Sequence, residues 1–317
     1  MNKTTTLSLI FLSSLTTIGC SPDDKNQITY TTVKQSNGKD FEIPIETVYK
    51  DLSTPESVTI NSHDIYISNI GGSPSESLNL GFLTKNGKKV LTGLDDPKGM
   101  AIIADGKFAV LSDHPNIKLI DLESMSVVQT LPVDSAGFLN DAVPLSEKTA
   151  LVSDTGTGNV YKVEFSNQSI SYSTFITSYQ LNGNGVNGLA FDSSSRILYL
   201  VTSSFGGNPN QGHIYKVSLD SDLNLVSQVN QLIPSILGNG NLDGIAVKDG
   251  KLIISDWEND MNNSSIFIFD LSSNSLSYVI SGNFNSAADI ALDDNKNLYI
   301  PEFKSGIVAK INLESLL

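Results

Sequence analysis

A two-part sequence motif recurs six times along the 317-residue chain, and it constrains the fold more than any other feature. Each copy begins with a polar or small residue and continues with a short apolar run, a tight polar turn, a second apolar run and a polar residue. The fifth copy is the clearest, with apolar runs at residues 244–247 and 252–254. The copies begin at positions 56, 98, 140, 187, 243 and 288, so successive intervals are 42, 42, 47, 56 and 45 residues.

These intervals match the length of a four-stranded propeller blade. The first two runs of each copy are nearly continuous in apolar residues, which is typical of strands covered on both faces. A third run, such as residues 160–165, alternates as a strand nearer the solvent does. We therefore predict an all-β, six-bladed β-propeller over residues 41–317. The alternative is a sandwich of two stacked sheets, and six copies at this spacing argue against it.

The two ends of the chain are expected to meet in one blade. The sixth copy reaches Leu317 after only its third strand, so its blade lacks an outer strand. Residues 43–49 precede the first copy and have strand character. We predict that this N-terminal strand completes the last blade and closes the ring.

The first twenty residues have the pattern of an export signal. Lys3 supplies a positive start, residues 7–15 form a short apolar region, and Gly19 precedes Cys20. This resembles a bacterial lipoprotein signal, in which the cysteine becomes the lipidated N-terminus. The alternative is an ordinary secretory signal, but Cys20 is the only cysteine and has no intramolecular disulfide partner. We predict a signal peptide at 1–19, lipidation of Cys20 and a flexible tether over 20–40.

That prediction implies a place in the cell. The protein would be lipid-anchored in the bacterial cell envelope, on the periplasmic face of the outer membrane or at the cell surface. It would contact the membrane only through the anchor on Cys20, because the apolar run is too short to span a bilayer. The formal net charge of −14 and the absence of a basic cluster exclude nucleic acid as a partner. We expect a small-molecule ligand or substrate instead.

Two sets of residues should lie around the same mouth of the propeller channel, because the start of each first strand and the end of each second strand share one face. The first-strand ring comprises Glu56, Lys98, Asn140, Asn187, Asp243 and Ala288. The second-strand ring comprises Asn69, Asp113, Asp154, Ser203, Asp256 and Glu302. Asp141 and Asp289 follow members of the first ring, and His114 and Trp257 follow members of the second.

The two rings suggest different roles. Carboxylate and amide oxygens from several blades suit a hard divalent cation such as Ca²⁺. However, Asp and Asn at strand ends often accept hydrogen bonds from local backbone groups. For any single Asp of the second-strand ring we expect that structural role. The first-strand ring keeps its register while its residue types vary, which favours a functional role there.

The same residues carry a family resemblance. Residues 56–58 (Glu-Ser-Val), 140–141 (Asn-Asp), 187–189 (Asn-Gly-Leu) and 243–245 (Asp-Gly-Ile) are similar to motifs of the senescence marker protein/gluconolactonase, or regucalcin-like, propellers. The resemblance covers roughly residues 45–315, in the same order and with the same blade spacing. It points to a poorly characterised bacterial lipoprotein branch of that family. Phe138 stands where lactonases of the family often carry an arginine.

The resemblance implies a site and an activity. The metal ligands would be Glu56, Asn187 and Asp243, holding a divalent metal that we expect to be Ca²⁺. Asp243 and Asn140 would be the catalytic pair, the former also a possible base. The substrate-binding residues would be Lys98, Asn140, Asp141, His114, Trp257 and Asp289. The implied function is a metal-dependent hydrolase of a lactone or related ester; the alternative is a non-catalytic ligand- or protein-binding propeller of the cell envelope.

Overall fold

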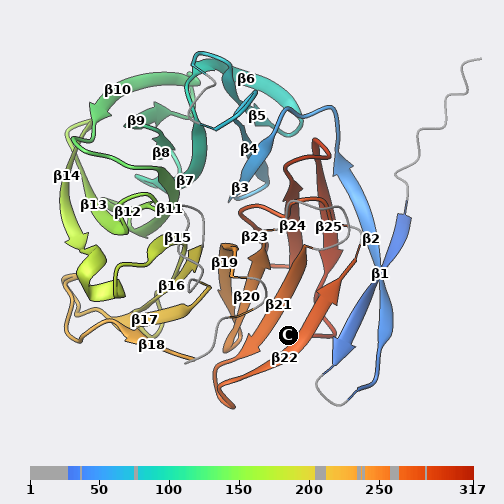
Figure 1. Cartoon of the computed structure of the whole chain (residues 1–317). Coiled ribbons are helices and arrows are strands. Elements are labelled where there is room, and N and C mark those ends of the chain that lie inside the picture. Colours follow the sequence, from blue (N-terminus) through green and yellow to red (C-terminus); the bar gives the residue numbers. More distant parts are fainter. Residues whose placement is uncertain are drawn as a thin grey trace, which may run out of the picture.

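The computed structural model places the six repeats as six blades around a central axis (Figure 1). It describes residues 28–35, 38–74, 78–203, 212–233, 237, 240–257, 264–282 and 284–317. The predicted signal peptide and Cys20 lie outside these residues, so the anchor and the cell-envelope location stay predictions. Within the described part of the chain, no helix has the length and apolarity needed to cross a bilayer.

The first three blades are regular four-stranded antiparallel sheets. Blade one contains β3 (Pro55–Asn61), β4 (Asp64–Asn69), β5 (Gly81–Lys85) and β6 (Lys88–Leu94). Blade two contains β7 (Pro97–Ile103), β8 (Phe108–Asp113), β9 (Asn116–Asp121) and β10 (Ser126–Pro132). Blade three contains β11 (Leu139–Ser146), β12 (Thr149–Asp154), β13 (Asn159–Ser166) and β14 (Ser169–Ile176).

The last three blades depart more from the regular pattern. A 3₁₀ helix, η1 (Ser178–Leu181), precedes blade four, which contains β15 (Gly185–Asp192), β16 (Ile197–Ser203), β17 (Ile214–Ser218) and the short β18 (Asn230–Gln231). Blade five contains β19 (Leu242–Lys248), β20 (Lys251–Asp256), β21 (Ser265–Asp270) and β22 (Ser275–Ser281). Blade six contains β23 (Ala291–Leu292), β24 (Asn297–Glu302), β25 (Ile307–Asn312) and β2 (Phe41–Tyr49).

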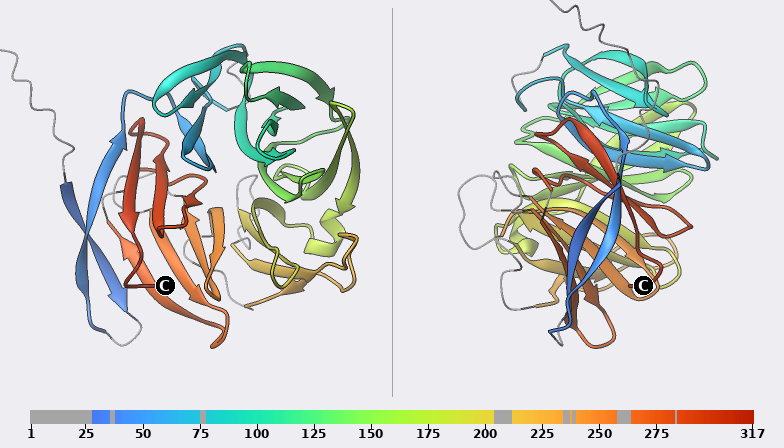
Figure 2. Two further views of the ribbon diagram at one scale, coloured as in Figure 1. Left: turned by 180° about the vertical axis from the view of Figure 1, so that it is seen from behind. Right: turned by 90° about the vertical axis from the view of Figure 1, so that its right-hand side faces the viewer.

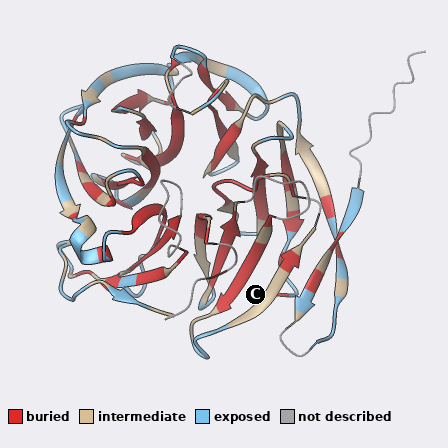
Figure 3. Ribbon diagram, in the orientation of Figure 1, coloured by how far each residue is buried: buried red, intermediate tan, exposed pale blue. Residues whose placement is uncertain are grey.

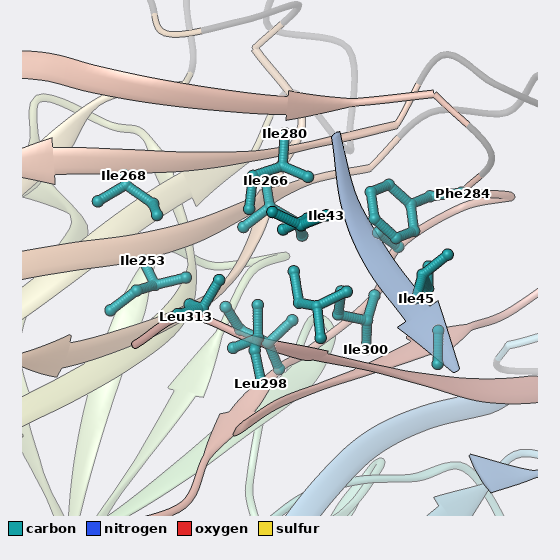
Figure 4. Packing of buried hydrophobic residues seen from close by; sticks show 14 of the residues in the cluster. Ile43, Ile45, Ile253, Ile266, Ile268, Ile280, Phe284, Leu298, Ile300 and Leu313 are labelled. Carbon is teal, nitrogen blue, oxygen red and sulfur yellow. The ribbon is translucent and has the colours of Figure 1, made fainter. Parts of the chain in front are cut away.

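The predicted closure of the ring is confirmed. Strand β2 pairs antiparallel with β25, with Ile45 opposite Ile311, and so supplies the outer strand of blade six. Ile43 and Ile45 are buried in a cluster with side chains of blades five and six (Figure 4). Burying apolar surface stabilises a fold by about 25 cal/mol per Å². The packing of Ile43 and Ile45 therefore contributes substantially to the free energy that keeps the ring of blades closed.

Residues 28–35 differ from the prediction. They were assigned to the flexible tether, but they form strand β1 (Ile28–Gln35), which pairs with both β2 and β22. Blades five and six are thereby joined into one nine-stranded sheet, with β1 on the outer side of the ring (Figure 2). The physical reason is local: Val33 is fully buried in the core cluster, and Thr31 Oγ1 donates to the carbonyl oxygens of Ser281 and Gly282.

Burial follows the order of strands within a blade. The inner strands are buried and the outer ones are largely exposed, as with β8 and β10 of blade two (Figure 3). The apolar side chains pack between neighbouring blades in several clusters rather than in one central core. The channel axis is therefore left for polar residues.

A β-bulge interrupts the first strand of each of the first five blades, and it aims the first-strand ring toward the axis. The register shifts lie between Pro55 and Ser57, Pro97 and Met100, Leu139 and Ala142, Val186 and Leu189, and Leu242 and Ile245. Each shift spans the position predicted to face the channel mouth. Bulges bend a strand and redirect its side chains, which explains how the same position in each blade comes to face the axis.

Candidate functional site

The first-strand ring borders a cavity of about 420 Å³ at one mouth of the channel. Its lining includes five of the six ring members: Glu56, Lys98, Asn140, Asn187 and Asp243. The sixth, Ala288, is buried and does not line the cavity. The sequence register therefore brought together side chains that are separated by up to 187 residues along the chain.

Three of these side chains have a buried oxygen without a hydrogen-bond partner: Glu56 Oε2, Asn187 Oδ1 and Asp243 Oδ1. They are the three residues to which the resemblance assigned metal ligation. Leaving a buried polar atom unsatisfied costs about 1–3 kcal/mol, so three at one cavity require an explanation. The orientation of the Asn187 amide is set by its Nδ2, which donates to the carbonyl oxygen of Leu242 at 3.2 Å and leaves Oδ1 as the unsatisfied atom.

The chemistry of this set fits a hard divalent cation. Two carboxylates and an amide oxygen are typical Ca²⁺ ligands, and water or substrate oxygens complete the six to eight positions. Within the described residues no three His, Cys, Asp or Glu side chains group as a metal site, so the set depends on counting the amide of Asn187. A divalent cation would satisfy all three orphaned oxygens at once.

The protonation of the two carboxyl groups supports the same reading. The pKa of Asp243 is raised to about 8, mainly by burial and also by the charge of the nearby Asp141, while Lys98 opposes the rise. Burial, and then the charge of Asp243, raise the pKa of Glu56 well above its usual range. In the protein without a cation, Asp243 therefore favours the protonated form at neutral pH, because a buried charge is costly.

Lys98 enters the same cavity, and its charge is balanced by a residue that the sequence analysis missed. Its Nζ lies 2.6 Å from Asp96 Oδ2, and both side chains are at most 2% exposed. The same Nζ lies 4.2 Å from the centre of the Phe138 ring. Because Asp96 compensates Lys98, the negative charge of Glu56 and Asp243 remains available for a cation.

Asn140 is held by a short hydrogen-bond relay. Its Nδ2 donates to Thr155 Oγ1 at 3.2 Å, and Thr155 Oγ1 donates to the carbonyl oxygen of Val186 at 2.9 Å. The relay links the first strands of blades three and four through the residue that follows β12. The amide of Asn140 is thereby held in a defined orientation at the cavity wall.

Asp141 and Asp289 lie elsewhere than predicted. The sequence analysis placed both at the mouth, but they line a second cavity of about 280 Å³ on the other side of the ring. Consecutive residues of a strand point to opposite sides, so the neighbour of Asn140 cannot share its cavity. The two carboxyl groups come from opposite blades, and each affects the pKa of the other. Burial raises the pKa of Asp141 to about 6 and that of Asp289 well above its usual range.

Glycines make room for that carboxyl pair. A Cβ on Gly99 would lie 2.6 Å from Asp141 Oδ1, and one on Gly244 would lie 2.6 Å from Asp289 Oδ1. Asp141 is further fixed by the amide N–H groups of Ala142 and Leu189, and Asp289 by the hydroxyl of Ser57. Each carboxyl group of the pair thus accepts at least one hydrogen bond, in contrast to the orphaned oxygens of the cavity at the mouth.

His114 and Trp257 have different places. Trp257 lines the mouth cavity, and its ring packs edge-on against Phe303 with centroids 4.9 Å apart. His114 does not line it; its Nδ1 accepts from the Leu139 amide at 3.3 Å, and its ring lies beside Phe138. Burial lowers the pKa of His114, which keeps the ring neutral at physiological pH. His114 therefore supports the wall of the cavity from behind.

Four of the six members of the second-strand ring have the structural role expected of them: Asn69, Asp113, Asp154 and Glu302. Asp154 accepts from the backbone N–H groups of Gly137, Phe138, Gly156 and Thr157. Asp113 accepts from those of Asp95 and Asp96, Asn69 from that of Ser53, and Glu302 from that of Asn285. Each of these side chains anchors the loop that enters the first strand of its own blade.

In three blades, the residue after the second strand lines the cavity. Ile70, Trp257 and Phe303 line the cavity, and the backbone N–H of each donates to the loop that enters its blade. The sequence analysis selected only His114 and Trp257 from this position. Applying the repeat register evenly to all copies would also have identified Ile70, Thr155 and Phe303. Ser203, a member of the second-strand ring, also lines the cavity as predicted, whereas Asn241, Pro74 and Lys304 complete the lining with no comparable signal in the sequence.

Comparison with known proteins gives the fold. No family model matches the chain, and no curated protein sequence matches it significantly. Among solved structures, a luciferin-regenerating enzyme superposes with a TM-score of 0.61 at 12% identity, covering 89% of this chain and 95% of that one. A calcium-binding regucalcin from Agrobacterium tumefaciens gives 0.60 at 14% identity, covering 82% and 90%.

A third similar structure is a putative 6-phosphogluconolactonase from Bacteroides fragilis, with a TM-score of 0.55 at 13% identity, covering 88% of this chain and 89% of that one. The structural neighbours thus include regucalcin-like and lactonase-like propellers, as the sequence resemblance suggested. At these identities the likeness shows a shared fold: the chain is a β-propeller of the same architecture as these proteins.

Proposed function

We propose that the protein is a hydrolase that uses a divalent cation, expected to be Ca²⁺, to cleave a lactone or related ester at the channel mouth. The observation that carries the proposal is the set of three orphaned buried oxygens on Glu56, Asn187 and Asp243. The regucalcin and lactonase neighbours support it as relatives in fold, since one is described as calcium-binding and another as a putative lactonase.

A cation bound there would polarise the carbonyl of a lactone and lower the pKa of a nearby water. Hydrolysis adds that water to the carbonyl carbon and breaks the bond to the ring oxygen, which takes up the proton to give a hydroxy acid. Asp243 lies at the same cavity and is the candidate base for the proton that the water loses. Asn140, held by Thr155, is the candidate donor to the substrate.

The rest of the mouth serves these steps. Lys98 is paired with Asp96, which offsets part of its positive charge beside the cation ligands. The walls formed by Phe138, Trp257 and Phe303 exclude water from part of the cavity, which strengthens electrostatic interactions inside it.

The test combines cation binding with turnover. Titration of the purified protein with Ca²⁺ at pH 8, followed by calorimetry, is expected to show one site that is lost in Glu56→Gln and Asp243→Asn. A panel of lactones and esters is expected to contain at least one substrate whose hydrolysis requires the cation. Asp293→Asn is the matched control, because it removes a carboxylate that lines neither the mouth cavity nor the cavity of Asp141 and Asp289, but a separate pocket beside Ser62 and His63.

Two results would decide against the proposal. Unchanged cation binding in both ligand variants would show that the site is misplaced. Cation binding without turnover of any lactone or ester would favour the alternative, a propeller that binds a ligand without cleaving it.

A further inference from the structure

The walls of the mouth cavity are unlike those of a site for a polyhydroxylated sugar. Beyond the first-strand ring, the lining contains five apolar residues, Ile70, Pro74, Phe138, Trp257 and Phe303, and three polar ones, Ser203, Asn241 and Lys304. Hydroxyl groups of a sugar need hydrogen-bond partners, and a site built of carbon surfaces leaves them unsatisfied. The orphaned oxygens belong to Glu56, Asn187 and Asp243, which line the same cavity.

The aromatic residues come from opposite sides of the ring. First strands contact one another in the cyclic order β3, β7, β11, β15, β19 and β23, so blades three and six are opposite each other. Phe138 immediately precedes β11 of blade three, and Phe303 immediately follows β24 of blade six. Trp257, which follows β20 of blade five, packs against Phe303. A ligand in the cavity therefore meets an aromatic surface on two sides.

These aromatic residues are held in place before any ligand arrives. The backbone N–H of Phe138 donates to Asp154 Oδ1 at 2.7 Å, that of Trp257 to Asn241 O at 2.8 Å, and that of Phe303 to Ser286 O at 3.0 Å. Side-chain contacts add to this: Lys98 Nζ lies over the Phe138 ring, and Trp257 and Phe303 hold each other. Such preorganisation lowers the entropic cost of binding.

We propose that the substrate class is a lactone or ester with an aromatic or flat apolar substituent, held between Phe138 on one side and Trp257 with Phe303 on the other. The reactive carbonyl would then face Glu56, Asn187 and Asp243, the proposed cation ligands. A cavity of about 420 Å³ accommodates a ligand of this kind, since small-molecule sites have volumes of about 300–1,000 Å³. This inference rests on the proposed function for the reactive group and on the aromatic walls for the substituent.

The chain carries its own reporter of binding. Trp257 is the only tryptophan of the protein, so its intrinsic fluorescence reports occupancy of this cavity without any need for turnover. Titration with γ-phenyl-γ-butyrolactone is expected to give a saturable change, whereas glucono-δ-lactone gives none at the same concentrations. Phe303→Ser is expected to raise the dissociation constant about tenfold, as loss of an aromatic contact does. Phe303→Leu, which keeps the wall apolar, is the matched control.

The outcomes separate this inference from the proposed function. Binding of the phenyl lactone without hydrolysis would leave the substrate-class inference standing and remove the hydrolase. Hydrolysis of gluconolactone, with no fluorescence change on adding the phenyl lactone, would overturn the inference and leave the hydrolase. Equal affinity of wild type and Phe303→Ser for the phenyl lactone would also overturn it.

Discussion

The two rings of polar residues at the channel mouth look alike in the sequence and differ in the structure. Asp154, in the second-strand ring, accepts hydrogen bonds from four backbone N–H groups. Asp243, in the first-strand ring, has a buried oxygen with no partner. The carboxylate of Asp154 is fully hydrogen-bonded within its own blade, whereas that of Asp243 can still bind a positive group.

The difference follows from where each position lies in the blade. The end of the second strand faces the loop that enters the same blade, whose backbone N–H groups need acceptors. The bulged start of the first strand faces the axis, where no backbone donors are available to it. In most blades the repeated fold therefore gives the second-strand ring a structural role. The first-strand ring has no such role and is available for binding or catalysis.

The two rings of residues can be compared only if the ring of blades is closed. Opening the ring of blades is therefore expected to have the largest effect on stability. Deletion of residues 41–49 removes β2, with the buried Ile43 and Ile45, and should destabilise the fold by more than about 5 kcal/mol. Urea denaturation followed by circular dichroism measures the loss. Point variants at the exposed Glu42 serve as the control, and a truncated protein that melts like the full chain would contradict the closure.

Asp96→Asn is expected to produce the next largest effect, because it leaves the buried ammonium group of Lys98 without its partner. Breaking a buried ion pair from one side costs about 3–5 kcal/mol. The calcium affinity should also fall, since Lys98 would then oppose the cation. A second substitution, Lys98→Met, should restore much of both losses, and a double variant no more stable than Asp96→Asn would contradict this account.

Removing an anchor from the second-strand ring is expected to destabilise the fold while leaving the cation ligands in place. Asp154→Ala leaves several backbone N–H groups without an acceptor and should cost about 3 kcal/mol in the free energy of unfolding. Below the melting transition, calcium binding should persist in this variant. Loss of calcium binding with unchanged stability would mean that the two rings have been assigned the wrong way round.

The first-strand ring should show the opposite behaviour. In protein without a cation at pH 8, Asp243→Asn is expected to stabilise the fold by about 1–2 kcal/mol, because it removes a costly buried charge. The same variant should lose more than about 100-fold in calcium affinity, which exceeds the usual cost of losing an outer-shell partner. A destabilised Asp243→Asn would indicate that the carboxyl group has a structural partner after all.

The pH dependence gives the smallest and most gradual effect. The raised pKa values of Asp243 and Asp141 mean that the folded state holds protons more tightly than the unfolded state. Stability without a cation is therefore greatest near pH 4 and falls as the pH rises toward about 8. Calcium affinity should change in the opposite direction, rising up to tenfold per pH unit for each displaced proton. Thermal melts with and without calcium at pH 5 to 8 measure both trends.

The blades and the register of the site were predictable from the sequence because both depend on short-range patterns. The repeat shows which strand of each blade faces the axis. The sequence alone therefore predicts that Glu56, Asn187 and Asp243 lie at one mouth of the channel. Asp141 and Asp289 could not be placed by the same reasoning, because a one-residue step at a bulge moves a side chain to the other cavity.

The partners of the site residues were harder to predict. Asp96 balances Lys98 through the path of a loop, which leaves no periodic pattern in the sequence. Strand β1 escaped notice because only Val33 and Thr31 of its eight residues are buried. Phe303 could have been predicted from the sequence, since it occupies the same repeat position as Trp257 and His114.

The most direct test of the account is a crystal structure of the protein grown with calcium. We predict density for one cation at the mouth cavity, about 2.3–2.6 Å from oxygens of Glu56, Asn187 and Asp243. Asp154 should keep its backbone partners and make no contact with the ion. A cation bound at the second-strand ring, or none at the mouth with the three oxygens still unpartnered, would contradict the central claim.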